Sequence, residues 1–157
     1  MPHVDDPLGP YPAAGDSTAC RRLLDEMVAG NVPIPLGASR LGLPPPASWS
    51  PGQIVALTDL DREMTLPSGI VFGGYIACLV DHFAGLAMLT VLPDGASFVT
   101  ATLEVRYQAP LRQGRVRVQA AAERCGSRQV IVSVAFSQDG RTASQGRVEQ
   151  IVRLANG

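Results

Sequence analysis

Cysteine and charge are both scarce in this 157-residue sequence, and each shortage excludes a class of protein. The cysteines number three, Cys20, Cys78 and Cys125, and none has the spacing of a metal or redox motif. An odd number without such spacing predicts no metal site, and we expect reduced thiols in a cytoplasmic protein. The formal net charge is −1 with 17% charged residues, which indicates no basic surface and excludes nucleic acid as an expected partner.

Signals for secretion and for membrane insertion are also missing. The first residues lack a positively charged segment followed by an apolar run, so we expect no secretory signal. The longest apolar run, residues 70–92, is long enough to span a bilayer. It is nevertheless interrupted near its middle by Asp81 and His82, and no basic cluster flanks it, so we predict that the protein does not enter a membrane.

Proline separates the N-terminal third of the chain from the rest. Residues 1–17 are rich in Pro, Gly and Asp, without apolar periodicity, which predicts a flexible arm. Residues 18–50 are predicted to form a helix that ends near Ala29 and then an extended, proline-rich connector anchored by Trp49. Residues 51–157 are predicted to form the main domain.

The stretch from Ser68 to Asp81 predicts a glycine turn that opens a long apolar helix with one carboxylate. Residues 75–92 are almost wholly apolar, and a helix that is apolar all round is expected to be buried on every side. A buried aspartate is costly unless it is paired or used, which makes Asp81 the first functional candidate. Gly73 and Gly74 let a ligand approach the helix start, where free amides favour an oxyanion. The combination indicates a hydrolytic site.

The remaining chain shows the period-two alternation of β-strands. One strand is predicted before the helix, over residues 53–60 and on to about Met64, and the helix is expected to end near Leu92. Four strands are predicted after it, over residues 98–107, 115–124, 129–137 and 142–154, with an Asp-Gly hairpin between the last two. This order predicts an α+β domain in which an antiparallel sheet of five or six strands, ending in a four-stranded meander, curls around one helix.

Two local details follow from the same pattern. Alternation along residues 98–107 places Thr100 on the opposite face of the strand from Leu103 and Val105. Gly146, inside the last predicted strand, is expected to mark a β-bulge.

Three motifs carry a resemblance to a known family. The first runs Leu66-Pro67-Ser68-Gly69-Ile70-Val71-Phe72-Gly73-Gly74 and is followed by Asp81. The second runs Val99-Thr100-Ala101-Thr102-Leu103-Glu104-Val105-Arg106-Tyr107 and is followed by Pro110. The third is Arg124-Cys125-Gly126-Ser127-Arg128. Over residues 53–154 the chain resembles a hotdog-fold thioesterase of the phenylacetic-acid-degradation (PaaI-like) family.

The resemblance implies hydrolysis of an acyl thioester of coenzyme A or a carrier protein, without a metal or organic cofactor. It implies dimers joined edge to edge through their sheets, with tetramers as a further possibility, and pairing would remove an exposed sheet edge. Gly73 takes the position whose N–H polarises the thioester carbonyl, and Asp81 that of the base or nucleophile. Thr100 falls where a hydroxyl contacts the attacking water. Gly73 of one chain and Asp81 of the other would form one site.

Two positions depart from the family pattern, since Phe72 replaces the usual histidine and Leu66 the usual asparagine. Both changes remove polar groups near the reacting atoms, so a non-catalytic acyl-thioester binding protein is the alternative function. Together with Gly74 and Tyr75, these residues are expected to line an apolar substrate site. Arg128, and secondarily Arg124, are predicted to bind coenzyme A phosphates, although solvated arginines at strand ends fit the sequence equally well.

A second alternative function concerns His82. The run His82-Phe83-Ala84-Gly85 is similar to a motif of hotdog dehydratases, in which the histidine precedes the central helix. Here the histidine lies within the predicted helix, and adjacent helical residues point apart, so His82 and Asp81 are not expected to act as a dyad. Cys78, three residues before Asp81, is predicted to belong to the core, because an apolar environment raises a thiol pKa and suppresses its reactivity.

Overall fold

The computed structural model describes residues 17–32, 36–93, 95–124 and 128–154. Its helices are α1 (Ser17–Ala29), α2 (Leu36–Arg40), the 3-10 helix η1 (Arg62–Met64) and α3 (Gly73–Leu89). Its strands are β1 (Ser48–Ser50), β2 (Gln53–Leu60), β3 (Ala96–Tyr107), β4 (Gly114–Arg124), β5 (Gln129–Gln138) and β6 (Arg141–Leu154). The predicted α+β class and the positions of the long helix and the five main strands are confirmed.

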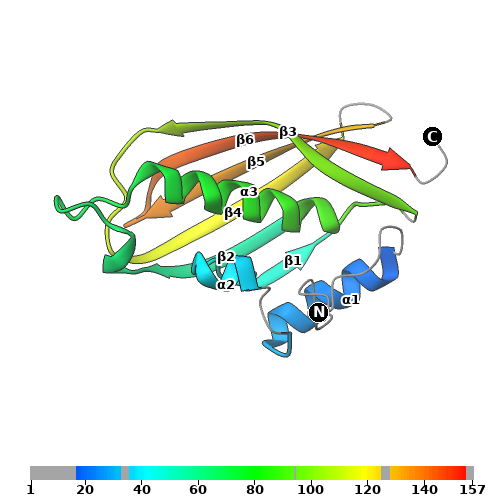
Figure 1. Cartoon of the computed structure of the whole chain (residues 1–157), viewed down its shortest axis with the longest axis horizontal. Helices are drawn as coiled ribbons and strands as arrows, with labels where there is room; N and C mark the ends of the chain where they lie inside the picture. Colours follow the sequence, from blue (N-terminus) through cyan, green and yellow to red (C-terminus); the bar gives the residue numbers. More distant parts are fainter. Residues whose placement is uncertain (1–16, 33–35, 94, 125–127, 155–157) are drawn as a thin grey trace, which may run out of the picture.

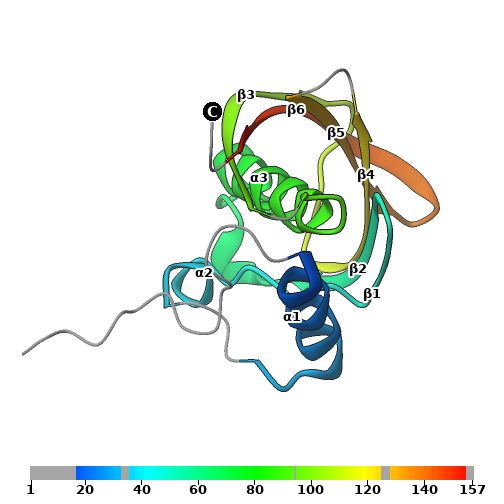
Figure 2. The ribbon, with the colours of Figure 1, turned by 90° about the vertical axis from the view of Figure 1, so that its right-hand side faces the viewer.

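One six-stranded antiparallel sheet, in the order β1-β2-β4-β5-β6-β3, curls around α3 (Figures 1 and 2). The predicted four-stranded meander is wrong for β3, because that strand pairs with β6 and leaves β4 to pair with β2. Only β4, β5 and β6 form a meander. The long helix between β2 and β3 carries the chain across to the far edge of the sheet.

The inner face of the sheet, which is the face turned towards α3, follows the predicted alternation in β4 and β5. Its buried residues there include Val116, Val118, Val132, Val134 and Phe136. Burying such side chains contributes about 1.5–3 kcal/mol each, which makes this face the main source of stability. The turn between β5 and β6 forms as predicted, with Asp139 and Gly140 both at positive φ.

Gly146 does not mark a β-bulge, which corrects the prediction. It pairs in register with Val105 and Val134 in the middle of the sheet. A Cβ atom at this position would overlap the side chain of Val80 on α3. The glycine is therefore needed because the helix lies unusually close to the sheet there.

A bulge does occur in β3, at Ala101. The pairing moves from Thr100 opposite Gln150 to Thr102 opposite Glu149, so Ala101 is the extra residue. Because opposed residues share a face, Thr100 lies on the inner face together with Leu103, which pairs with Val148. The predicted separation of Thr100 from Leu103 is therefore wrong: one inserted residue turns the threonine towards α3.

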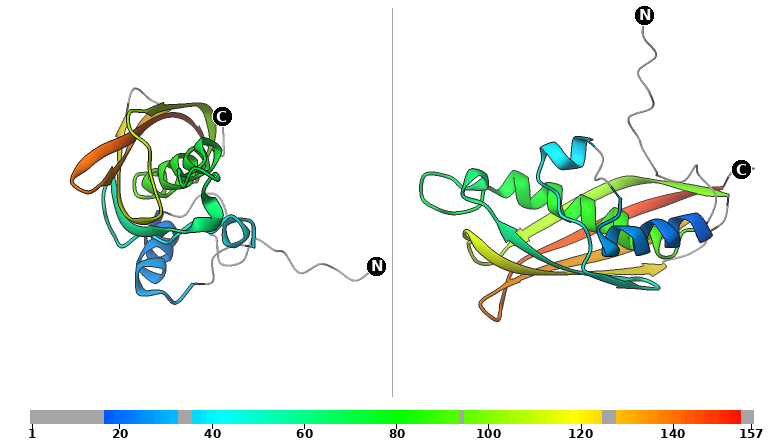
Figure 3. Two further views of the ribbon diagram at one scale, coloured as in Figure 1. Left: turned by 90° about the vertical axis from the view of Figure 1, so that its left-hand side faces the viewer. Right: turned by 90° about the horizontal axis from the view of Figure 1, so that it is seen from below.

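The N-terminal segments cover one side of α3 (Figure 3). Helix α1 ends at the predicted residue, and Trp49 anchors the connector by donating its indole N–H to Asp25 Oδ1 at 2.8 Å. The connector is not extended throughout, because it contains the helix α2; its end forms the short strand β1. Strand β2 ends at Leu60 rather than Met64, since Asp61 caps η1. The predicted arm lies outside the described residues, apart from Ser17 at the start of α1.

The complete burial predicted for the central helix is also wrong. Tyr75 and His82 face the connector, but Gly74 and Asp81 are exposed, and Cys78 and Gly85 between and beyond them are only half-buried. These last four residues, spaced three or four apart, form what we call the open face of α3. The helix ends at Leu89, three residues before the predicted end. No helix in the described part of the chain is long and apolar enough to cross a bilayer.

Candidate active site

The first turn of α3 presents backbone N–H groups that no side chain caps. Phe72 is the N-cap residue in an extended conformation, and it makes no side-chain capping bond. Neither Gly73 nor Gly74 donates its N–H to a backbone carbonyl among the described residues. A Cβ atom on Gly74 would lie 2.5 Å from the Phe72 ring, so a glycine is required where the ring folds over the helix start. Free amides at a helix N-terminus favour an anion or a developing oxyanion.

Tyr107 is a site residue that sequence reasoning missed. It is the last residue of β3, and its hydroxyl donates to the Gly73 carbonyl oxygen at 2.8 Å. This bond holds the peptide unit that carries the Gly74 N–H, although the tyrosine side chain itself remains exposed. The only signal in the sequence was an aromatic residue at the end of a strand, which is too common to indicate a site.

An open cavity of about 520 Å³ lies beside this helix start. Leu66, Ile70, Pro110 and Leu111 give it apolar walls, and Gly73, Gly74 and Tyr107 also line it. Phe72 and Leu66 are both large apolar side chains left exposed, at 44% and 50%. An acyl group is a chemically suitable occupant, because these walls offer apolar contact with few polar groups.

Asp81 is exposed in the single chain, so its predicted burial is wrong. Its Oδ1 accepts a hydrogen bond from Thr100 Oγ1 at 3.0 Å. Residues 73 and 81 are eight apart on one helix, which separates them by about 12 Å along its axis. Asp81 therefore cannot reach a carbonyl held at the Gly73 N–H of the same chain. The uncapped helix start and the carboxylate of the predicted site are both present, but one chain does not bring them together.

The remaining predicted site residues lie elsewhere. Tyr75 is buried, and its hydroxyl donates to the Gly42 carbonyl oxygen at 2.9 Å, outside the cavity. Burial raises the pKa of this hydroxyl. Arg128 is exposed just before β5, two strands away from β3. Arg124 ends β4, and its side chain lies outside the described residues.

His82 faces away from Asp81 and contacts the connector. Its Nε2 lies 2.7 Å from the Pro44 carbonyl oxygen, which assigns the proton to Nε2 because a carbonyl can only accept. Burial lowers the pKa of the imidazole, opposed by the bond to Pro44 and by the charge of Asp81. This environment stabilises a neutral histidine that ties α3 to the connector. Cys78 is half-buried against the core, as predicted.

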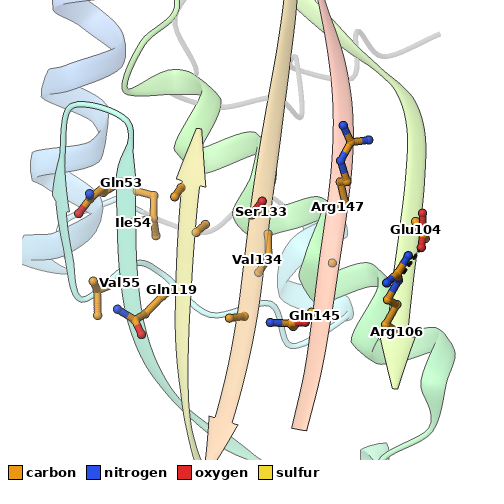
Figure 4. Close-up of a pocket in the computed structure, with 14 residues that line it drawn as sticks. Gln53, Ile54, Val55, Glu104, Arg106, Gln119, Ser133, Val134, Gln145 and Arg147 are labelled. Carbon is orange, nitrogen blue, oxygen red and sulfur yellow. Dashed lines mark hydrogen bonds and ion pairs between the residues drawn. The ribbon is translucent and has the colours of Figure 1, made fainter. Parts of the chain in front are cut away.

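A second depression, of about 550 Å³, lies across the outer face of the sheet, on the opposite side from α3 (Figure 4). Figure 4 labels Ser133 and Gln119 among the residues that line it, with Arg106 and Arg147 towards the β3 side. Arg106 is paired with Glu104 at 2.9 Å. Because neither Asp81 nor the start of α3 borders this depression, it is not part of the candidate active site. Among the described residues, no group of three or more His, Cys, Asp and Glu side chains is arranged to hold a metal ion.

Comparison with known proteins decides the family. The sequence profile of the thioesterase superfamily matches residues 68–144, which include the start of α3, Asp81 and the Thr100 strand. A candidate esterase of Saccharolobus solfataricus is 30% identical over 95 residues, covering 60% of this chain and 67% of that protein. The chain belongs to the thioesterase superfamily. Membership assigns thioester hydrolysis as its general chemistry.

Solved structures of thioesterases share the fold. A candidate thioesterase of Ralstonia eutropha, related to phenylacetic acid degradation, is 25% identical with a TM-score of 0.71, over 82% of this chain and 98% of that one. A Streptococcus mutans protein bound to acetyl-CoA is 20% identical with a TM-score of 0.62, over 68% and 85% of the two chains. The predicted hotdog fold of the PaaI type is confirmed.

Proposed function

We propose that this thioesterase hydrolyses acyl-CoA thioesters at sites shared between two copies of the chain. The observation that carries the proposal is the geometry along α3. An exposed carboxylate, Asp81, is held by Thr100 about 12 Å from the free amides at Gly73, so each copy holds half of a site. A partner that brings its own helix start to this carboxylate would complete it.

Strand β3 supports a dimer of this kind. No strand of the described chain pairs with its outer edge, and the apolar side chains of Val99 and Leu103 remain exposed on it. Within one chain, Thr100 bonds to Asp81 and Tyr107 bonds to Gly73. Antiparallel pairing of two β3 strands, centred midway between residues 100 and 107, would set Thr100 opposite Tyr107 of the partner subunit. Asp81 would then face the partner subunit's Gly73.

The proposed chemistry divides between the two chains. The Gly73 N–H, at the positive end of the helix dipole, binds the thioester carbonyl oxygen and stabilises the oxyanion. In one route Asp81 takes a proton from water, the hydroxide attacks the carbonyl carbon, and the C–S bond breaks to release the thiolate. In the other route Asp81 attacks the carbonyl carbon itself, the C–S bond breaks to release the thiolate, and water then cleaves the resulting anhydride into the free acid and the Asp81 carboxylate. Both routes are open, and Thr100 serves both by fixing one carboxylate oxygen.

Several features favour acyl-CoA as the substrate class. Leu66 makes the cavity apolar and the exposed Phe72 lies at the adjacent helix start, which together suit an aromatic or medium aliphatic acyl group. Arg128 is proposed to contact the coenzyme A phosphates, and the S. mutans structure of the same fold was solved with acetyl-CoA. Tyr75 is left out of the proposed site because its side chain is buried and bonded to Gly42.

The test is thiol release over a panel of acyl-CoA and acyl-carrier-protein esters, comparing the wild type with Asp81→Asn. Loss of a general base or nucleophile predicts that turnover falls by about 10²–10⁴-fold. Asp59→Asn is the matched control. It removes an exposed carboxylate from β2 that pairs with Arg115 at 2.8 Å, and we expect little change in turnover.

The alternative functions predict other outcomes. If the wild type binds an acyl-CoA without turning it over, the protein is an acyl-thioester binding protein and not an enzyme. The apolar residues Leu66 and Phe72, at positions where the family has polar ones, would agree with that result. A hydratase would require the imidazole of His82 in the site, but its Nε2 is bonded to Pro44. If the wild type shows no turnover and no binding with any ester of the panel, the proposal is disproved.

A further inference from the structure

The inner face of β6 contains a buried amide that the proposed mechanism does not use. Gln150 is 0% exposed, and neither its Oε1 nor its Nε2 has a hydrogen-bond partner among the residues that the structure describes. Buried polar side chains in folded proteins are nearly always hydrogen-bonded, because an unpaired buried amide destabilises the fold. An apolar residue would fit this core position better on stability grounds alone.

The position of Gln150 connects it to the candidate site. It lies directly opposite Thr100 in the β3–β6 ladder, with Val130 on its other side. Opposed side chains in an antiparallel pair lie on the same face, with Cβ atoms about 4.5–5.5 Å apart, a gap that a glutamine side chain is long enough to span after a change of its torsion angles. The bulge at Ala101 is what brings Thr100 onto this face.

The donors and acceptors of Asp81, Thr100 and Gln150 allow only one direction for the hydrogen bonds between them. An ionised Asp81 can only accept, so the single proton of the Thr100 hydroxyl goes to Asp81 Oδ1. The threonine oxygen then has lone pairs left but no proton to donate. The Nε2 group of Gln150 carries two protons and can supply the missing donor.

We propose that Gln150 is a positioning residue whose Nε2, unbonded in the single chain, turns to donate to Thr100 Oγ1 when the site is assembled, an inference that rests on the proposed role of Asp81. The bond directs the threonine proton at Asp81 Oδ1 and leaves Oδ2 aimed at the water or the thioester. Hydrogen bonds in such a chain polarise one another, which strengthens the Thr100–Asp81 bond. Gln150 does not border the cavity beside Gly73, so its effect falls on the chemical step and not on substrate binding.

The kinetic test is a double-mutant cycle with Gln150→Leu and Thr100→Val. Each single substitution is expected to lower kcat by about 3- to 10-fold, the value of one net hydrogen bond, with KM changed by less than about twofold. In the Thr100→Val background, Gln150→Leu is expected to lower kcat no further, because its partner is already gone. Gln150→Met provides a second variant of similar volume if the leucine variant folds poorly.

Ser144→Ala is the matched control. Ser144 is also buried on the inner face of β6 without a partner among the described residues, but it lies opposite Tyr107, whose hydroxyl already bonds to the Gly73 carbonyl oxygen, and not opposite Thr100. Its replacement is expected to leave kcat unchanged. An equal loss in Ser144→Ala and Gln150→Leu, or multiplicative losses in the double mutant, would overturn the positioning role.

A second arm of the cycle does not depend on turnover. Urea unfolding midpoints of the same four proteins should be non-additive if Gln150 bonds to Thr100, and additive if the two side chains do not interact. A wild type without turnover on any thioester disproves the proposed function, while the unfolding cycle still decides the contact. Additive midpoints disprove the contact even in an active enzyme.

Discussion

The two edges of the sheet differ in almost every respect. Strand β1 is a three-residue edge, and Trp49 on it is tied to Asp25 of α1. Strand β3 is a twelve-residue edge, exposed on both faces over most of its length and with no strand of the described chain beyond it. Natural sheets shorten or cover edges that must stay unpaired, so the contrast indicates that one edge is closed off and the other is kept for pairing.

The same contrast divides α3. Its closed side meets the sheet and the connector through Tyr75, Val80 and His82, which are buried or bonded. Its open face carries Asp81 and the exposed helix start beside β3. Stability is therefore concentrated on one side of the molecule and the candidate chemistry on the other, and substitutions on the two sides should change different measurements.

The largest expected effect comes from Leu103→Lys, which is designed to prevent pairing of the β3 edge, here called the open edge, with a second copy. Leu103 is 37% exposed on β3, where a lysine can remain solvated in the monomer but not against a second copy. We expect a shift from dimer to monomer by light scattering and a loss of thiol release of more than about 100-fold, because each site needs both chains.

Leu57→Lys is the control for this substitution. Leu57 is 52% exposed on β2, on the outer face of the sheet and away from the open edge. The Leu57→Lys substitution should leave unchanged both the dimer mass measured by light scattering and the rate of thiol release. A Leu103→Lys protein that remained dimeric and active would contradict the assignment of β3 as the pairing edge.

An intermediate effect is expected on the closed side with Gly146→Ala. The added methyl group overlaps Val80, and overpacking of this kind lowers the free energy of unfolding by about 1–3 kcal/mol. Urea denaturation measures the loss, and Val80→Ala in the same chain should recover part of it. Gly37→Ala in α2 is the control, since a Cβ atom there contacts nothing within 4 Å. Equal midpoints for the two alanine variants would argue against the close helix–sheet approach.

The smallest effect is a pH dependence of stability from His82. Because burial lowers its folded pKa below the ordinary value of about 6.5, the unfolded chain binds a proton that the folded chain does not. The free energy of unfolding should therefore decrease as pH falls below about 6.5, until the folded pKa is reached. His82→Gln keeps a donor towards Pro44 without titrating, and we expect a weaker pH dependence in urea unfolding between pH 7.5 and 5.5, on the order of 1 kcal/mol or less. Identical slopes for both proteins would show that His82 makes no contribution.

The sequence predicted what depends on local pattern. The strands containing Val118 and Val134 alternate cleanly, the Asp139–Gly140 turn has a strong dipeptide signal, and the helix from Gly73 is marked by its glycines and apolar run. These features were confirmed because residues close in sequence determine them. The oxyanion donor and the carboxylate were also proposed from the sequence, and their pairing across two chains, implied only by the family resemblance, stays a prediction.

What failed depends on contacts between distant residues. No local sequence signal indicates that β3 pairs with β6. The alternation around Thr100 is regular in the sequence, and only the strand pairing shows that Ala101 is an extra residue. Gly146 could equally have been a bulge or a close approach, and only the position of Val80 decides. Asp81 was expected to be buried because its helix is apolar, but the side of that helix left open in the single chain is set by where the sheet and the connector end.

The link between Trp49 and Asp25 gives the protein an internal optical reporter. Trp49 is the single tryptophan in the sequence, and its indole bridges the N-terminal helix and the short edge strand. Intrinsic tryptophan fluorescence therefore reports detachment of that helix. A change in emission at low denaturant concentration would show that the helix is released before the sheet around α3 unfolds.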